Sequence, residues 1–299
     1  MKLLNIMKIY DCTMFFDEHM LFDLRLNVLN EYVDKFVVVE SLYTHSGVKK
    51  QKNFNIKNYE KFKDKIIYIL IDEEPGNIKL ISNKNSDNKN TAIKRMNSLK
   101  RIELQYNTIS KGLGNADSED LIILSDCDEI PNLKDLSKLN IKNDILIFKQ
   151  KIFYYKFNLL HKNIDWFGTK ACKKKNLISL NWLRNVKNKK YPSWRLDTIF
   201  SNNRYTNINI INNGGWHFTN IKTSKDIIYK LSNFGEHNEF EKSDLTEEKL
   251  NKLIENGELY FDHSLDTKNT SKYSAQIKLT KADQSILPNH LINNYNAYK

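Results

Sequence analysis

Short apolar runs and helical stripes alternate through the first 131 residues. The apolar runs lack a clean apolar and polar alternation, which is typical of strands buried on both faces, and they lie at residues 3–10, 36–40, 65–72 and 121–124. Residues 16–32 and 91–110 carry apolar side chains at helical spacing, and Thr91 can cap the second helix after a polar loop at 77–90. Strands that alternate with helices predict an α/β fold with a doubly wound sheet.

The pattern changes after residue 131. Residues 144–157 predict one long strand or two short ones, and residues 213–219 predict a strand kinked by glycine. Thr223 and Asp226 have the spacing of a capping box, so we expect a helix that continues to Phe234. Another short helix is predicted at 246–255, because Gly257 follows it. This second half is therefore predicted to be mixed α+β.

Composition narrows the class of protein. The chain has 299 residues, 40% of them hydrophobic, which is enough for one large domain. Its formal net charge is +11, but only six of the 47 basic residues are Arg, and the longest basic run is 173–175. Nucleic-acid binding favours a concentrated basic stripe with aromatic side chains. We therefore predict no nucleic-acid partner and at most a peripheral membrane contact.

The cysteines and the first residues of the chain bear on the cellular compartment in which the protein is expected. The three cysteines are widely separated, so neither a zinc site nor a disulfide framework is indicated. No run of about 18 apolar residues occurs, and the first ten residues are too short and too soon charged for a signal peptide. These features predict a soluble, cytoplasmic protein.

The most informative stretch is residues 121–131, where an apolar run ends in three acids. On an extended segment, residues two apart point the same way, so Asp126 and Asp128 can converge on a cation. Hard carboxylate oxygens suit Mg²⁺ or Mn²⁺, whose other positions are often filled by substrate phosphates. Pro131 is expected to stop further strand pairing just after Glu129. The alternative is a solvated turn or a helix cap, where such a pattern often occurs by chance.

A second candidate group follows two glycines at 214 and 215. Trp216 offers a stacking face for a sugar or base, and His217 can complete a metal shell or bond to phosphate. The alternative is a turn that enters a strand whose Trp is core and whose His has an ordinary partner.

Two charged residues and three tryptophans are further candidates. Glu40 either contacts a nucleoside at the sheet edge or caps a turn through backbone amides. Arg101 either points at phosphates or pairs with a carboxylate on its own helix. Trp166, Trp182 and Trp194 either stack on sugars or anchor packing.

Four ordered stretches carry a more specific signal than any single motif. They are residues 9–18 with 24–26, 37–41 and 46–47; residues 105–113; residues 124–131; and residues 214–218 with 230–234. Together they resemble the family-17 glycosyltransferases, whose activity is that of β-1,4-mannosyl-glycoprotein β-1,4-N-acetylglucosaminyltransferase. The resemblance implies a Rossmann-like GT-A fold, a UDP-sugar donor such as UDP-N-acetylglucosamine, an inverting reaction and a divalent metal, Mn²⁺ or Mg²⁺.

The chain departs from the family at two positions. Tyr106 stands where Arg is frequent, which puts one phosphate or helix contact in doubt. Cys127 replaces the usual Val and is harmless if its side chain points into the core. Animal relatives carry a membrane anchor and act on N-glycans, so the glycan or glycoconjugate acceptor here need not be an N-glycan.

The motifs and the implied chemistry together predict roles for particular residues. Metal binding falls to Asp128, to Asp126 directly or through water, and to His217 as a distal ligand. Nucleotide-sugar binding falls to Glu40, Arg101, Asp126, Glu129 and Trp216. The catalytic base is expected at Asp197, with Glu236 and Asp165 as rivals. The base is predicted from its position after Trp194 and Arg195 and before Trp216 and His217. Residues 1–240 form the predicted GT-A-like domain, with a donor-nucleotide half at 1–131 and an acceptor half at 132–240, and residues 241–299 form a helical extension packed on it.

Two other functions are compatible with parts of this pattern. A sugar-nucleotide nucleotidyltransferase also combines an α/β sheet with a carboxylate-bound metal, but it needs a Gly-rich basic loop that residues 11–18 do not contain. A non-enzymatic protein that binds nucleic acid or another surface would instead use the +11 charge.

Overall fold

The computed structural model describes residues 7–136, 144–188, 207–235, 237–241, 243–262 and 277–298. Its strands are β1 (Ile9–Met14), β2 (Lys35–Ser41), β3 (Ile66–Ile71), β4 (Leu121–Leu124), β5 (Glu129–Pro131), β6 (Ile145–Phe148), β7 (Gln150–Tyr154), β8 (Leu159–Trp166), β9 (Lys170–Lys173), β10 (Ile208–Ile211), β11 (Gly215–Thr219) and β12 (Thr280–Lys281). Its α-helices are α1 (His19–Leu29), α2 (Asp87–Thr108), α3 (Leu180–Asn185), α5 (Ser224–Asn233), α6 (His237–Phe240), α7 (Glu247–Asn256) and α8 (Asn289–Asn293).

The strands form two sheets. The larger sheet has the order β10-β6-β9-β4-β1-β2-β3, and the smaller one has the order β12-β8-β7-β11-β5. Strands β4, β1, β2 and β3 are parallel, as predicted from their apolar runs, whereas β9 enters antiparallel between β4 and β6. The fold is therefore a mixed α/β fold, and its parallel part is Rossmann-like.

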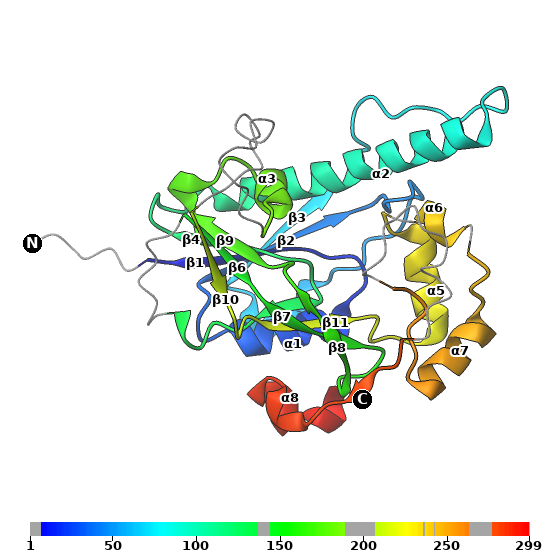
Figure 1. The fold of residues 1–299 in the computed structure, drawn as a ribbon. Coiled ribbons are helices and arrows are strands. Elements are labelled where there is room, and N and C mark those ends of the chain that lie inside the picture. Colours follow the sequence, from blue (N-terminus) through cyan, green and yellow to red (C-terminus); the bar gives the residue numbers. More distant parts are fainter. Residues whose placement is uncertain are drawn as a thin grey trace, which may run out of the picture.

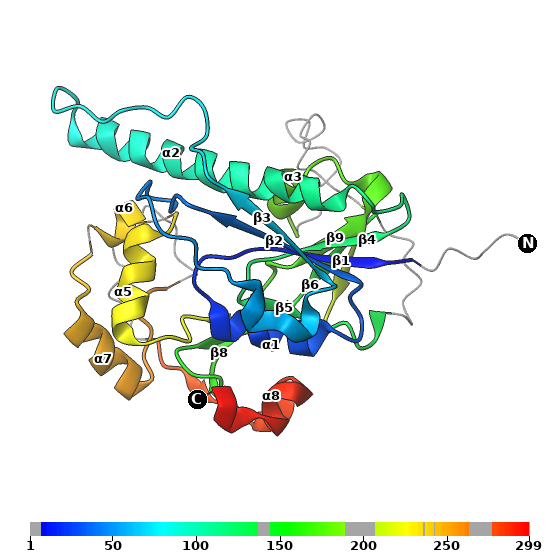
Figure 2. The ribbon, with the colours of Figure 1, turned by 180° about the vertical axis from the view of Figure 1, so that it is seen from behind.

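Both faces of the larger sheet are covered by helices. Alternate side chains of β2 point to opposite faces: Phe36 and Val38 pack with α1, and Val37 and Val39 pack with the end of α2 and with α3. Figures 1 and 2 show α2 and α3 on one side of the sheet and α1 on the other. The prediction of strands buried on both faces is confirmed for β1, β2 and β4, but the edge strand β3 is only partly buried, with Leu70 38% exposed.

Several predicted boundaries are corrected. The first strand begins at Ile9 rather than residue 3, and residues 1–6 lie outside the described part. Helix α2 begins at Asp87 because Ser86 caps it, so Thr91 lies inside the helix. Pro131 is the last residue of β5 and lies opposite Gly215, so strand pairing ends at Pro131 as predicted, although it continues for two residues after Glu129. β5 is an edge strand, where proline is tolerated because its position need not donate to a neighbour.

The predicted helix signals after residue 220 are confirmed. Thr223 accepts a hydrogen bond from the Asp226 amide at the start of α5, and α7 ends at Gly257 with a φ of 65°. The C-terminal part is not only helical, because β12 pairs with β8 and α8 packs against α1. Within the described residues, no helix is long and apolar enough to cross a membrane.

Candidate functional site

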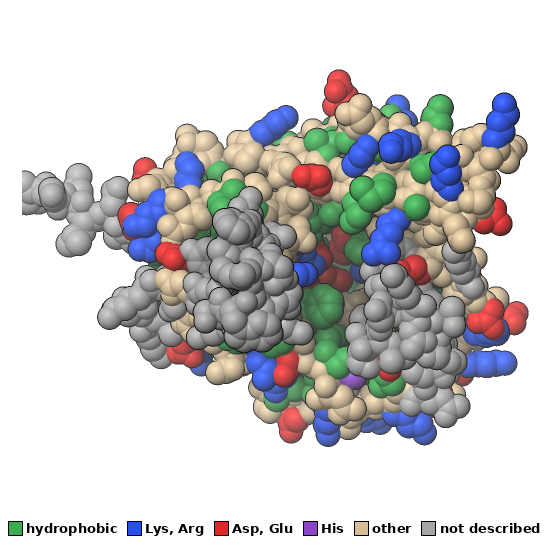
Figure 3. Space-filling view, turned by 45° about the horizontal axis from the view of Figure 1, so that its top comes forward, with side chains coloured by type: hydrophobic (Ala, Val, Ile, Leu, Met, Phe, Trp, Pro, Cys, Tyr) green, Lys and Arg blue, Asp and Glu red, His purple; other side chains and the backbone are tan. Residues whose placement is uncertain are grey.

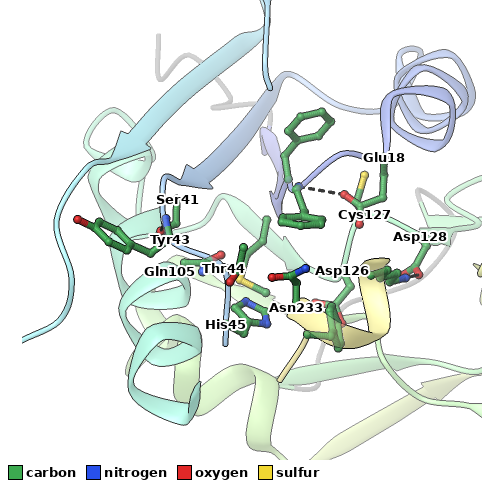
Figure 4. A pocket seen from close by; sticks show the side chains of 15 residues that line it. Glu18, Ser41, Tyr43, Thr44, His45, Gln105, Asp126, Cys127, Asp128 and Asn233 are labelled. Atoms are coloured by element: carbon green, nitrogen blue, oxygen red, sulfur yellow. Dashed lines mark hydrogen bonds and ion pairs between the residues drawn. The ribbon is translucent and has the colours of Figure 1, made fainter. Parts of the chain in front are cut away.

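A pocket opens at the carboxyl ends of β1, β2 and β4. Figure 4 shows side chains of its wall, which α2 and α5 complete. The pocket contains about 580 Å³ of space outside the protein atoms, which includes open solvent. Its lining residues are Met14, Phe15, Phe16, Glu18, Ser41, Tyr43, Thr44, His45, Gln105, Asp126, Cys127, Asp128, Lys230, Asn233 and Phe234. Parallel α/β sheets bind ligands at this edge.

The residues between β4 and β5, Ser125 to Asp128, are named the acidic loop. The amide of Glu129 donates to the Asp126 carbonyl at 3.0 Å, so the loop is a tight turn rather than an extended strand. The expectation that Asp126 and Asp128 converge because they are two apart on a strand is therefore wrong. Cys127 between them is 4% exposed and belongs to the core, as predicted.

A buried arginine holds the acidic loop from below. Arg25 of α1 is fully buried and forms two hydrogen bonds, of 2.6 and 2.7 Å, with the carboxylate of Asp11 in β1. Its guanidinium also donates to Ser125 Oγ at 2.6 Å and to the carbonyls of Asp126 and Glu129 at 3.1 and 2.7 Å. This planar group with several donors fixes both ends of the turn.

Asp126 is held from the side of α2 and α3. Its Oδ1 accepts a hydrogen bond from Tyr106 at 2.8 Å, and its Oδ2 accepts one from Arg184 at 2.6 Å. Burial, followed by the nearby Asp126 carboxylate, raises the pKa of Tyr106 well above its ordinary value, so the hydroxyl stays a donor. Both oxygens of Asp126 therefore have protein partners.

Glu129 lies behind the acidic loop and supports it. It is fully buried, accepts a 2.6 Å hydrogen bond from the indole of Trp166 and also pairs with Arg184. Burial raises the pKa of Glu129 against the opposing effect of Arg184. A Cβ on Gly168 would lie 1.9 Å from Glu129 Oε1, so only glycine fits there. Glu129 is thus a structural partner of Asp126 and does not line the pocket.

Asp128 faces a different set of partners. Its Oδ2 lies 3.3 Å from Lys230 Nζ of α5, and its Oδ1 lies 3.6 Å from His217 Nε2 of β11. Burial alone would raise the pKa of Asp128, but Lys230 and His217 lower it well below the ordinary value. The carboxylate is therefore ionised at neutral pH and lies beside the Lys230 ammonium. His217 Nδ1 is buried without a hydrogen-bond partner among the described residues, and Nε2 is the ring nitrogen that faces Asp128.

Three residues predicted to bind the nucleotide sugar have protein partners instead and do not line the pocket. Glu40 is fully buried and accepts hydrogen bonds from the amides of residues 53 and 54, so its role is to cap a turn. Arg101 pairs with Glu74, which lies in the loop after β3 and not on its own helix. Trp216 points away from His217, because neighbours on a strand alternate, and its indole donates to the Ile286 carbonyl at 2.6 Å.

One of the three candidates for the catalytic base, Asp165, lies within the described residues. Asp197 and Glu236 lie outside the described residues, as does Trp194. Asp165 forms a surface ion pair with Lys149 at 2.8 Å and does not line the pocket.

Sequence reasoning missed the cationic partners of the acidic loop. Arg25 left a signal, since it occupies the same helix face as Leu21 and Leu29 and therefore needed an acidic partner. Lys230 stands among the residues that carry the family resemblance, but without a role. Arg184 lies in a stretch with no motif, so its contact with Asp126 follows only from the fold.

Comparison with protein families finds a match that covers almost the whole chain. The family model described as Glycosyltransferase family 17 matches residues 2–299. The chain belongs to glycosyltransferase family 17. It is therefore a transferase that uses a sugar donor and an acceptor. No curated protein matches the sequence of this family-17 glycosyltransferase.

Two solved structures share limited similarity with this family-17 glycosyltransferase. One is a putative glucose-1-phosphate thymidylyltransferase from Bacillus anthracis in complex with a sucrose, with a TM-score of 0.31, 9% identity, and coverage of 57% of this chain and 72% of that chain. The other is the inositol-1-phosphate CTP transferase from T. maritima, with a TM-score of 0.26, 15% identity, and coverage of 56% and 71% respectively. We transfer no residue role from either structure.

Proposed function

We propose that this glycosyltransferase moves a sugar from a UDP-sugar to a hydroxyl of a glycan acceptor, with inversion at the anomeric carbon and with a divalent cation. UDP-N-acetylglucosamine is the first donor to test, because the family resemblance implies it. We also assign the two-sheet α/β architecture to the GT-A type. The observation that carries the proposal is the acidic loop at the mouth of a pocket formed by the carboxyl ends of parallel strands.

The charge of the pocket supports a role for a cation. Glu18, Asp126 and Asp128 line it together with Lys230, and Arg184 pairs with Asp126 from outside the lining, so three carboxylates and two cations leave a net formal charge of −1. A diphosphate would be repelled by this lining unless positive charge were added. The aromatic rings of Phe16, Tyr43 and Phe234 supply apolar surface for a base or sugar.

Asp128 and His217 fit a Mn²⁺ or Mg²⁺ ion. Their facing atoms are 3.6 Å apart, which is longer than a hydrogen bond and leaves room for a shared cation. The described residues contain no group of three or more His, Cys, Asp or Glu side chains that could hold a metal. Such ions often take only one or two protein ligands and complete their shell with phosphates and water. Asp126 would join through water, since Tyr106 and Arg184 occupy its oxygens.

The residues then have separate tasks. A bound cation would supply positive charge against the diphosphate that leaves. Lys230 keeps Asp128 ionised and adds a further positive charge at the same end of the pocket. The acceptor oxygen forms a bond to the anomeric carbon as the bond to UDP breaks, and a carboxylate takes the hydroxyl proton. We propose Asp197 for that carboxylate, with Glu236 as the alternative.

The test measures UDP release from UDP-N-acetylglucosamine and other UDP-sugars with Mn²⁺, and pyrophosphate release from UTP with a sugar phosphate in parallel. We expect UDP release that EDTA abolishes and that Asp128→Ala lowers by about 10²–10³-fold. Asp244→Ala, at an exposed aspartate far from the pocket lining, serves as the matched control. Undiminished UDP release in Asp128→Ala would refute the metal assignment, and pyrophosphate release alone would favour a nucleotidyltransferase.

A thermal-shift experiment separates binding from turnover. UDP with Mn²⁺ is expected to raise the melting temperature of the wild type, because a ligand that binds only the folded state stabilises it. Asp128→Ala should lose this shift, whereas Asp197→Ala should keep it and lose turnover. An Asp197→Ala variant with normal turnover would transfer the role of base to Glu236.

A further inference from the structure

The start of α2 and the loop before it extend beyond the sheets. Figures 1 and 2 both show this segment at the periphery, away from the strands. We name residues 77–100 the α2 arm. It combines exposed apolar side chains with an excess of positive charge, and none of its residues lines the pocket at the acidic loop.

The apolar side chains of the α2 arm are unusually exposed for their type. Leu80 is 87% exposed, Ile81 54%, Met96 52% and Leu99 48%. Met96 and Leu99 share the outer face of α2, since residues three apart on a helix are neighbours. Single exposed apolar residues need no explanation, but several on one segment mark an interaction surface.

The loop holds its apolar pair in place. Asn97 forms two hydrogen bonds with the backbone of Lys79, at 2.8 and 3.0 Å, and Asn90 forms two with the backbone of Ser82, at 3.0 and 3.3 Å. Asn90 and Asn97 are seven residues apart, which places them on one face of α2. Leu80 and Ile81 lie between these two attachments. The apolar pair is thus fixed in its exposed position at both ends.

The net charge of the α2 arm indicates which class of partner it binds. The α2 arm contains six basic residues and one acid, Asp87, which gives a net formal charge of +5. Lys79, Lys84, Lys89 and Arg95 are exposed among them. Figure 3 shows basic and hydrophobic side chains intermixed on the upper part of that view. Nucleic-acid surfaces favour Arg and aromatic stacking residues, and the α2 arm has one Arg and no aromatic residue.

We infer that the α2 arm docks the protein on an anionic lipid bilayer, with Leu80 and Ile81 inserted at the interface and the lysines on the headgroups. Amphipathic segments bind membranes by this combination of apolar area and attraction to anionic lipids. The inference does not depend on which sugar the pocket binds. Docking at the α2 arm would hold the enzyme at a membrane surface through an exposed segment of the described residues.

Vesicle co-sedimentation tests the inference. We expect the full-length protein to sediment with phosphatidylcholine vesicles that contain 30% phosphatidylglycerol, and to stay in solution with phosphatidylcholine alone. Combined Lys84→Gln and Lys89→Gln should lower the partition coefficient by about 30-fold, because each lysine at such a surface contributes about fivefold. Combined Leu80→Ser and Ile81→Ser should lower it as well. The matched controls are Lys225→Gln with Lys252→Gln, and Ile178→Ser, all at exposed positions outside the α2 arm.

The outcomes are distinguishable from a failure of the proposed function. The thermal shift with UDP and Mn²⁺ should be the same in the arm variants and in the wild type, since no changed residue lines the pocket. Absence of partition into the anionic vesicles would overturn the inference. If the control variants lose as much partition into the vesicles as the arm variants, binding depends on overall charge, and the inference is overturned as well. Release from the vesicles by a small excess of RNA, with the apolar variants unaffected, would identify a nucleic-acid surface instead.

Discussion

Replacement of Arg25 by methionine tests whether this side chain holds the acidic loop. The change removes the two hydrogen bonds to Asp11 and the bonds to Ser125 Oγ and two backbone carbonyls. Asp11 is 1% exposed and Arg25 is fully buried, so the carboxylate would remain buried without its partner. Loss of one member of such a pair costs about 3–5 kcal/mol. This is a large share of the roughly 5–15 kcal/mol that stabilises most proteins.

A double-mutant cycle separates the free energy of the interaction between Asp11 and Arg25 from the loss of packing that each substitution causes. Asp11→Leu alone leaves the guanidinium buried without its carboxylate, and a similar loss is expected. The double variant Asp11→Leu with Arg25→Met removes both charges, so its loss should be smaller than the sum of the single losses by about 2 kcal/mol or more. The free energy of unfolding is measured by urea titration at pH 7.

Arg95→Met is the matched control, because Arg95 is exposed on α2. It should change the free energy of unfolding by less than about 0.5 kcal/mol. Losses in the Asp11 and Arg25 variants that add within about 0.5 kcal/mol would refute the pairing. A loss below about 1 kcal/mol for Arg25→Met would refute the claim that this arginine holds the loop.

Three other changes test the surroundings of the acidic loop. The pKa of Asp128 is lower in the folded protein than in the unfolded chain, so its contribution to the free energy of unfolding is present above about pH 4 and is lost below it. Asp128→Asn should therefore reduce the fall in the free energy of unfolding at acid pH. An unchanged fall would contradict the assignment. Gly168→Ala should lose about 1–3 kcal/mol in urea titrations, because its Cβ would overlap Glu129, whereas Gly76→Ala, with open space around it, should not. Tyr106→Phe should lose about 1 kcal/mol with its hydrogen bond to Asp126, and equal stability would refute that bond.

The sequence was informative where a local pattern determines structure. The apolar runs of β2 and β3, the capping box at Thr223 and the glycine end of α7 all depend on contacts within a few residues. Boundaries shifted where two local signals competed, as at the start of α2, where Ser86 caps the helix instead of Thr91. The acidic loop was placed correctly after a buried strand, but its conformation was not, because a turn changes the direction of each side chain.

The partners of the acidic residues could not be predicted in the same way. Arg184 is 58 residues from Asp126 in sequence, and Lys230 is 102 residues from Asp128. Such contacts depend on how α3 and α5 pack on the sheets, which no local spacing records. For Glu40, the pattern suggested a ligand contact where the structure shows a local one. An acid at the end of a strand can accept hydrogen bonds from the backbone amides of a turn as readily as it can bind a ligand.

The two aspartates of the acidic loop therefore differ in what they can do for a substrate. Asp126 is bound on both oxygens by Tyr106 and Arg184, so a ligand must displace one of them or act through water. Asp128 has one oxygen beside Lys230 and the other beside His217, at a distance longer than a hydrogen bond. Of these two aspartates, Asp128 can accept a cation at Oδ1 without the loss of a hydrogen bond. In the proposed function, Asp128 therefore binds the cation and Asp126 holds the loop in place.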